Sequence, residues 1–210
     1  MPLFREWGIG NTGLAAIWKI EEPESFFREQ TGLDSAIKSD TRRIEHLAGR
    51  FLLKQIKKDF PLHLIHKNEH DKPILPLNEV HFSISHSWPY IAAIIDSEKS
   101  VGIDIQTWNP AIHKIAYKFL SDDEQMMVGD DTRMLTLAWC AKETVYKWHG
   151  KRGVEFIEQL PIIKFDNSNC DNTNIFINLN NIPQIVFIEN IINIDFACTF
   201  INSVQNLAIS

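Results

Sequence analysis

Residues 101–106 read V-G-I-D-I-Q, an alternation of apolar and other side chains around which the neighbouring motifs are arranged. The alternation predicts a short strand, because successive side chains of a strand point to opposite faces. The apolar residues then face a core, whereas Gly102, Asp104 and Gln106 share the other face. A carboxylate there is costly to bury unless a cation meets it. Two interpretations follow: an edge strand with a solvated Asp104, or a metal ligand on a rigid strand where Gly102 leaves room for a ligand.

The composition of the 210-residue chain, 44% hydrophobic and 23% charged, is ordinary for a folded protein. This length can bury one sizeable core or two small ones. No apolar run is long enough to span a bilayer, and the first residues lack the pattern of an export signal. The cysteines show no CxxC spacing, which favours reduced thiols; they are Cys140, Cys170 and Cys198. We therefore expect a cytoplasmic protein without membrane attachment.

The charge of the chain is unevenly distributed. The formal net charge of −6 disfavours binding to nucleic acid. Two segments are nevertheless basic: residues 38–58 hold seven basic and two acidic side chains, and residues 142–152 hold four basic and one acidic. Two basic segments on an acidic chain suit a compact anionic ligand better than a long polyanion.

Hydrophobic spacing predicts helices and strands in mixed order. Helices are expected over residues 39–60, 112–128 and 132–149, and strands over residues 14–20, 80–87, 90–96 and 101–106. From Phe156 onward the alternation predicts an antiparallel meander that supplies core and carries little chemistry. The loop-rich connection before residue 80 contains three histidines, which we interpret as surface residues because no further ligand completes a zinc site.

Ser85 and His86 stand at the end of the strand predicted over residues 80–87. Side chains of these types at a strand end can donate hydrogen bonds to a phosphate. No G-x-S-x-G sequence surrounds the serine, which argues against a serine hydrolase. A plain turn remains the alternative interpretation.

Charged side chains recur at helical spacing in two of the predicted helices. Glu143 and Lys147 are four residues apart, hence on one helix face. They form either an ordinary surface ion pair or a carboxylate for a cation beside an ammonium for a phosphate. In the earlier basic helix Arg50 and Lys54 belong to a stripe whose simplest interpretation is a solvated face.

Six short motifs follow one another along the chain. They are R-R-I-E-H-L-A-G-R-F-L-L-K (42–54), K-P (72–73), F-S-I-S-H-S (82–87), V-G-I-D-I (101–105), F-L-S-D-D-E (119–124) and W-C-A-K-E-T-V-Y-K (139–147). In this order they resemble the 4′-phosphopantetheinyl transferase superfamily in its long, two-halved form. The resemblance runs from about residue 42 to residue 147, roughly half of the chain.

The resemblance implies an α+β fold, a pseudo-dimer of two similar halves with antiparallel sheets and packed helices. The halves would cover residues 1–98 and 99–210, and coenzyme A and Mg²⁺ would bind in the cleft between them. A chain that already contains both halves is expected to be a monomer.

The resemblance also implies a reaction. A serine of an apo acyl or peptidyl carrier protein would attack the β-phosphate of coenzyme A, take up the 4′-phosphopantetheine arm and release adenosine 3′,5′-bisphosphate. Asp104, Gln106 and Glu143 match the metal-binding positions, and Glu143 is also placed to act as the base. Glu143 and Lys147 are thus the expected catalytic residues. The positions expected to bind coenzyme A are Arg50, Lys54, Lys72, Ser85, His86, Lys142 and Lys147, and Glu124 matches an acidic position beside the active site.

One position departs from many long members of the family, which carry Glu where this chain has Gln106. The amide oxygen of Gln106 could bind a cation weakly or through water. Two alternatives to the transferase therefore remain. One is a coenzyme A-binding protein with little or no turnover, and the other is a Mg²⁺-dependent hydrolase of diphosphates.

Overall fold

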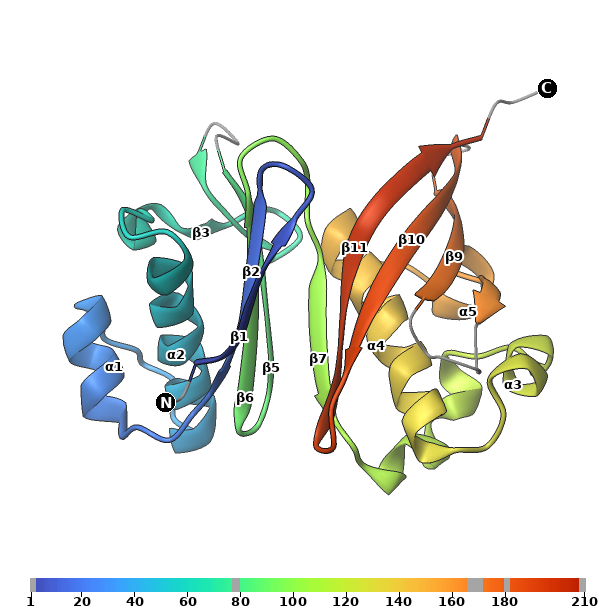
Figure 1. Cartoon of the computed structure of the whole chain (residues 1–210), viewed down its shortest axis with the longest axis horizontal. Helices are drawn as coiled ribbons and strands as arrows, with labels where there is room; N and C mark the ends of the chain where they lie inside the picture. The colour runs from blue at the N-terminus through green and yellow to red at the C-terminus, as the bar shows by residue number, and fades with distance from the viewer. Residues whose placement is uncertain (1–2, 77–79, 166–171, 180–181, 208–210) are drawn as a thin grey trace. The chain divides into compact units, whose positions relative to one another are not determined.

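The computed structural model describes residues 3–76, 80–165, 172–179 and 182–207 (Figure 1). The chain divides into two compact units after Val101, three residues beyond the boundary expected from the resemblance. Each unit has its own antiparallel sheet, its own long helix and its own hydrophobic core. Within the described residues, no helix combines the length and the apolar character needed to cross a bilayer.

Unit 1 is built on a four-stranded antiparallel sheet in the order β1-β2-β6-β5. Its strands are β1 (Leu3–Ile9), β2 (Gly13–Lys19), β5 (His81–Ser87) and β6 (Tyr90–Asp96). Helix α2 (Asp40–Ile56) packs on this sheet, and α1 (Glu24–Thr31) packs on α2. The short elements between them and β5 are η1 (Leu62–Leu64), β3 (His66–Lys67) and β4 (Pro73–Ile74).

Unit 2 is built on a five-stranded antiparallel sheet in the order β7-β11-β10-β9-β8. Its strands are β7 (Ile103–Thr107), β8 (Ile162–Phe165), β9 (Asn172–Leu179), β10 (Ile182–Ile192) and β11 (Phe196–Asn206). Helix α4 (Thr132–His149) packs along β7 and β11 (Figure 1). The remaining helical elements are η3 (Pro110–Lys114), η4 (Ala116–Lys118), α3 (Asp122–Val128) and α5 (Phe156–Gln159).

Most predicted elements are confirmed, among them α2, α4, β2, β5, β6, β7 and the antiparallel meander of β8 to β11. The single helix predicted over residues 112–128 is wrong, because two 3₁₀ turns precede a separate helix α3. Helix α3 begins with a capping box, in which the side chains of Ser121 and Glu124 each accept from the other residue's backbone N–H. Strand β1 and helix α1 were not predicted. Cys170 lies outside the described residues.

Gly102 determines how closely α4 approaches the start of β7. A Cβ atom at this position would lie 2.3 Å from the carbonyl oxygen of Thr144 and 2.8 Å from Cβ of Trp148. Only glycine allows a helix backbone to come so near. The expectation that Gly102 leaves room for a ligand is therefore wrong, because helix α4 fills that space.

Candidate active site

Asp104 is the second residue of β7 and is only 1% exposed, so the interpretation of a solvated Asp104 is wrong, although β7 is an edge strand of its sheet as that interpretation expected. Ile103 and Ile105 are fully buried on the opposite face. The predicted alternation is confirmed, because the Nε2 amide of Gln106 donates to Oδ2 of Asp104 at 2.9 Å. These two side chains therefore share one face of β7, as their spacing indicated.

Helix α4 brings two further charged side chains to Asp104. Nζ of Lys147 donates to Oδ1 of Asp104 at 2.6 Å. Burial and the negative charge of Asp104 raise the pKa of Glu143 to about 7, and the ammonium of Lys147 offsets part of this rise. The structure thus assembles Asp104, Gln106, Glu143 and Lys147 within unit 2, two from the first strand and two from the helix packed on it.

The donor set of this cluster suits a hard divalent cation that keeps other ligands. The described residues contain no group of three or more His, Cys, Asp or Glu side chains arranged to hold a metal ion. Mg²⁺ commonly uses one or two protein carboxylates and completes its octahedron with waters and substrate phosphates. Two carboxylates, Asp104 and Glu143, with the Gln106 amide beside them, fit that requirement.

The prediction that Lys142 binds coenzyme A is wrong for this structure. The side chain of Lys142 is fully buried, and its Nζ lies 2.6 Å from Oε1 of Glu124. The same ammonium donates to the carbonyl oxygens of Phe119 at 2.7 Å and Phe156 at 3.0 Å. Burial lowers the pKa of Lys142, and the ion pair with Glu124 offsets part of that shift. The ammonium is thus engaged inside unit 2.

Glu124 likewise makes contacts that stabilise the fold of unit 2. Its carboxylate accepts from the backbone N–H of Ser121 at 2.8 Å and of Ile162 at 2.8 Å, in addition to the Lys142 ammonium. Only 3% of Glu124 is exposed. Glu124 therefore joins the start of α3 to β8 and to α4. The signal for this role was present in the sequence, since S-D-D-E is a capping-box pattern.

The predicted phosphate-binding residues of unit 1 do not all come together. His86 is half exposed at the end of β5, with Nδ1 3.1 Å from Oε2 of Glu45 on α2. Ser85, its neighbour in the strand, points to the other face of the sheet and is 2% exposed. Lys54 donates to the carbonyl oxygen of Gln30 at 2.7 Å and so connects α2 with α1. Ser85 therefore lies on the other face of the sheet from His86, and the Lys54 ammonium is engaged between α1 and α2.

His86 belongs to a group of basic side chains around His46 that also includes Arg50 and Lys67, here called the basic group around His86. Burial, together with the positive charges of Arg50, His86 and Lys67, lowers the pKa of His46 to about 4. Burial also lowers the pKa of Arg50, which has no ion-pair partner among the described residues, and of Lys72. Sequence reasoning missed His46 and Lys67, although His46 precedes Arg50 by one helical turn and so had a readable position on α2.

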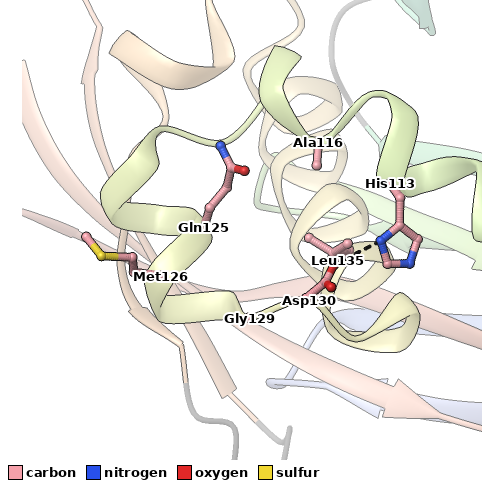
Figure 2. Close-up of a pocket in the computed structure, with 7 residues that line it drawn as sticks. All are labelled: His113, Ala116, Gln125, Met126, Gly129, Asp130 and Leu135. Carbon is pink, nitrogen blue, oxygen red and sulfur yellow. Dashed lines mark hydrogen bonds and ion pairs between the residues drawn. The ribbon is translucent and has the colours of Figure 1, made fainter.

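Two of the cavities that the described residues form lie in unit 2. One of about 250 Å³ reaches the Gln106 side chain, and its other lining residues include Thr107, Ile112, Thr136 and Trp139. The larger, of about 350 Å³, contains none of the predicted site residues (Figure 2). Its lining residues are His113, Ala116, Gln125, Met126, Gly129, Asp130 and Leu135. There the His113 ring lies 3.1 Å from the Asp130 carboxylate and 2.9 Å from the Thr132 hydroxyl.

The similarity to known proteins lies in unit 2, which contains the carboxylates of Asp104 and Glu143. The sequence model of the 4′-phosphopantetheinyl transferase superfamily matches residues 100–200. A 4′-phosphopantetheinyl transferase of Bacillus subtilis is 36% identical over 89 residues, and the 4′-phosphopantetheinyl transferase Sfp of Bacillus subtilis strain 168 is 35% identical over 89 residues. Each match covers 40% of this chain and 39% of the relative, so the similarity spans about two-fifths of either protein.

The matched region contains strand β7, helix α4 and the whole cluster of Asp104, Gln106, Glu143 and Lys147. Over residues 100–200 this chain is therefore similar in sequence to the 4′-phosphopantetheinyl transferase superfamily. This confirms the resemblance for the three motifs that lie in the matched region, at residues 101–105, 119–124 and 139–147.

Proposed function

We propose that this protein transfers the 4′-phosphopantetheine arm of coenzyme A to a serine of an apo acyl or peptidyl carrier protein. The observation that carries the proposal is the convergence of Asp104, Glu143 and Lys147 in the region that matches the superfamily. The serine oxygen would form a bond to the β-phosphorus of coenzyme A. The bond from that phosphorus to the bridging oxygen would break, and adenosine 3′,5′-bisphosphate would leave.

Glu143 is the group best suited to take the proton of the serine hydroxyl, directly or through a water. A general base works best when its pKa is near the operating pH, and the pKa of Glu143 is raised to about 7. The causes are burial and the neighbouring Asp104. Its place beside Asp104 also makes Glu143 a second carboxylate for a cation, whose charge would offset the repulsion between the two.

Lys147 is the group best suited to stabilise charge on the phosphates. Negative charge increases on the leaving oxygen as the bond to phosphorus breaks, and a fixed ammonium is most effective at such a place. Here Lys147 is held by its bond of 2.6 Å to Asp104. Mg²⁺ bound by Asp104 and Glu143, with Gln106 beside them, would supply further charge neutralisation at the phosphate oxygens.

The basic group around His86 is proposed to hold the 3′-phosphate of coenzyme A. The proposal is supported by the half-buried guanidinium of Arg50 and by the positive charges that lower the pKa of His46. The resemblance adds Lys72, and the Glu45 carboxylate beside His86 is the negative charge that a bound phosphate would meet there. The resemblance assigns coenzyme A to a cleft between the two halves of a pseudo-dimer, and we retain that assignment in the proposal. A monomer in the cytoplasm, without nucleic acid or membrane as partner, stays the prediction for the whole protein.

The deciding experiment is incubation with coenzyme A, Mg²⁺ and an apo carrier protein, followed by mass spectrometry of the carrier protein. Transfer adds one phosphopantetheine group to the carrier protein, and a carrier protein whose acceptor serine is replaced by alanine remains unmodified. Binding of coenzyme A without any mass change would favour the binding protein that the Gln106 position suggests. Cleavage of coenzyme A in the absence of carrier protein would favour a hydrolase.

A further inference from the structure

Asp104 has buried polar neighbours in unit 2 that have no role in the proposed function. Asp104 of β7 and Thr199 of β11 are direct partners in the antiparallel ladder. Directly opposed residues project their side chains on the same face of a sheet, about 5 Å apart. Thr199 is fully buried, so its hydroxyl must find partners inside the protein.

Helix α4 supplies those partners. The hydroxyl oxygens of Thr199 and Thr144 are 2.6 Å apart, and the Thr199 hydroxyl donates to Sγ of Cys140 at 3.3 Å. Cys140 and Thr144 are one helical turn apart, so both lie on the α4 face that covers the sheet. Because Cys140 contacts the Thr199 hydroxyl and Thr199 is the ladder partner of Asp104, the thiol also lies next to the Asp104 carboxylate.

The number of hydroxyl and thiol hydrogens allows one continuous chain of hydrogen bonds. Each hydroxyl and each thiol has one hydrogen to donate. Thr144 can donate to Thr199, Thr199 to Cys140 and Cys140 to the carboxylate of Asp104. The competing acceptors are backbone carbonyl oxygens, that of Thr199 at 3.0 Å from the Thr144 hydroxyl and that of Ala197 at 3.7 Å from the thiol. An ionised carboxylate is a stronger acceptor than a carbonyl and therefore favours the chain that ends on Asp104.

The thiol of Cys140 is well suited to be the last donor. It is fully buried, and a buried thiol without a neighbouring cation keeps its proton. Thiolate chemistry is excluded at this position, but donation to a carboxylate is not.

We infer that Cys140 and Thr199 are positioning residues, which orient the Asp104 carboxylate for a divalent cation through the chain Thr144–Thr199–Cys140–Asp104. The inference rests on the proposed function only in taking Asp104 as a cation ligand. Hydrogen-bond partners behind a metal ligand fix its orientation, and their loss typically lowers metal affinity about 10- to 100-fold.

The test measures cation binding without coenzyme A or carrier protein. Mn²⁺, a hard divalent cation that electron paramagnetic resonance detects, is titrated into the unmodified protein and into Thr199→Val and Cys140→Ala. Valine preserves the shape of threonine but lacks the hydroxyl, and alanine removes the thiol. We expect the Kd for Mn²⁺ to rise about tenfold in both variants. Thr199→Ser and Cys140→Ser retain a donor and should restore binding to within about threefold of the unmodified protein.

Cys198 offers a matched control for Cys140. It is equally buried, lies on the neighbouring position of β11 and is paired with Ile105, so its side chain is on the opposite face of the sheet. Cys198→Ala removes the same atoms from the same kind of environment and should leave the Kd for Mn²⁺ unchanged. Metal-free thermal melts of all variants show which of them remain folded.

The outcomes separate this inference from the proposed function. Unchanged Mn²⁺ binding in Thr199→Val and Cys140→Ala overturns the inference, and so does an equal loss in Cys198→Ala or in the two serine variants. A tenfold loss rescued by serine supports it even if the unmodified protein transfers nothing to a carrier protein, a result that would overturn the proposed function alone. In an active protein, the same substitutions should raise the Mg²⁺ concentration for half-maximal transfer and leave kcat at saturating Mg²⁺ within about twofold.

Discussion

At the scale of single residues, the position of Glu143 decides both reactivity and stability. An isolated glutamate ionises near pH 4.5, whereas the pKa of Glu143 in the folded protein is about 7. Folding therefore favours the protonated carboxyl. Between these two pH values the folded state binds more protons than the unfolded state, and the free energy of unfolding falls as pH rises. The whole shift corresponds to ~3 kcal/mol.

Glu143→Gln should therefore abolish transfer and remove this pH dependence. Glutamine keeps the size of the side chain but can neither accept the serine proton nor bind a cation as a carboxylate. In metal-free buffer the variant should have a higher Tm than the unmodified protein at pH 8 and a similar Tm at pH 5. Glu158→Gln, at an exposed position, should change neither property. Transfer within a few-fold of the unmodified rate would contradict the role of Glu143.

Lys147 and His86 are expected to act at opposite ends of coenzyme A. Lys147→Ala should lower kcat more than it raises KM, because its charge matters most while the bond to phosphorus breaks. His86→Ala should mainly raise KM for coenzyme A, because the 3′-phosphate is remote from the reacting phosphorus. Steady-state kinetics with a single carrier protein check both. The reverse pattern would mean that the two ends of the coenzyme are assigned the wrong way round.

A substitution of Gln106 tests whether position 106 faces the cation. In this structure its amide nitrogen donates to Asp104. In Gln106→Glu a carboxylate replaces that donor, so a divalent cation gains an anionic ligand while the metal-free protein gains repulsion. The Mg²⁺ concentration for half-maximal transfer should fall, and the metal-free Tm should fall as well. A Mg²⁺ titration of activity and melts with and without Mg²⁺ measure both. If neither changes, position 106 does not face the cation.

At the scale of elements, helix α4 shows what the sequence could and could not predict. Its bounds at residues 132–149 followed from hydrophobic spacing, and the i,i+4 relation placed Glu143 and Lys147 on one face. The sequence led us to predict Lys142 as a ligand of coenzyme A, because a charged residue in a motif can serve either a ligand or the interior. The distinguishing signal was its neighbours one turn away, Ala138 and Val145, which place Lys142 on an apolar face. Its partner Glu124 is distant in sequence and appears only in the folded chain.

Lys142→Ala should act on stability and not on cation binding. Removing the ammonium leaves the Glu124 carboxylate buried without its cation, which typically costs about 3–5 kcal/mol. Urea unfolding near neutral pH should show a loss of this size, and Lys151→Ala at an exposed position should show none. The Kd for Mn²⁺ of the protein that stays folded should be unchanged. A stable variant with a raised KM for coenzyme A would instead restore Lys142 as a ligand of the coenzyme.

At the scale of the whole molecule, the two units differ in how much of them could be predicted from the sequence. In unit 2 the alternation of residues 101–106 and the motif of α4 identified both elements that form the carboxylate cluster. In unit 1 the edge strand β1 was missed, because most of its side chains are exposed and its own pattern is weak. Such a strand forms by pairing with β2, a long-range effect that a local pattern does not record.

The proposal that one coenzyme A is held by residues of both units leads to a final prediction. Hydrogen exchange measured by mass spectrometry should slow on binding of coenzyme A in two places, the end of β5 with α2 in unit 1 and the second half of α4 in unit 2. Exchange slows where a ligand suppresses local opening. The first region contains His86 and Arg50, and the second contains Glu143 and Lys147.

Coenzyme A without its 3′-phosphate provides the matched ligand for this experiment. Dephospho-coenzyme A retains the pyrophosphate but lacks the anion assigned to the basic group around His86, so it should protect α4 while protecting β5 and α2 much less. His86→Ala should make coenzyme A itself behave in the same way, because the charge and the hydrogen bonds to the 3′-phosphate are lost together. Equal protection of both regions by dephospho-coenzyme A would contradict the assignment of the 3′-phosphate to unit 1, and protection confined to α4 with intact coenzyme A would contradict a ligand shared by the two units.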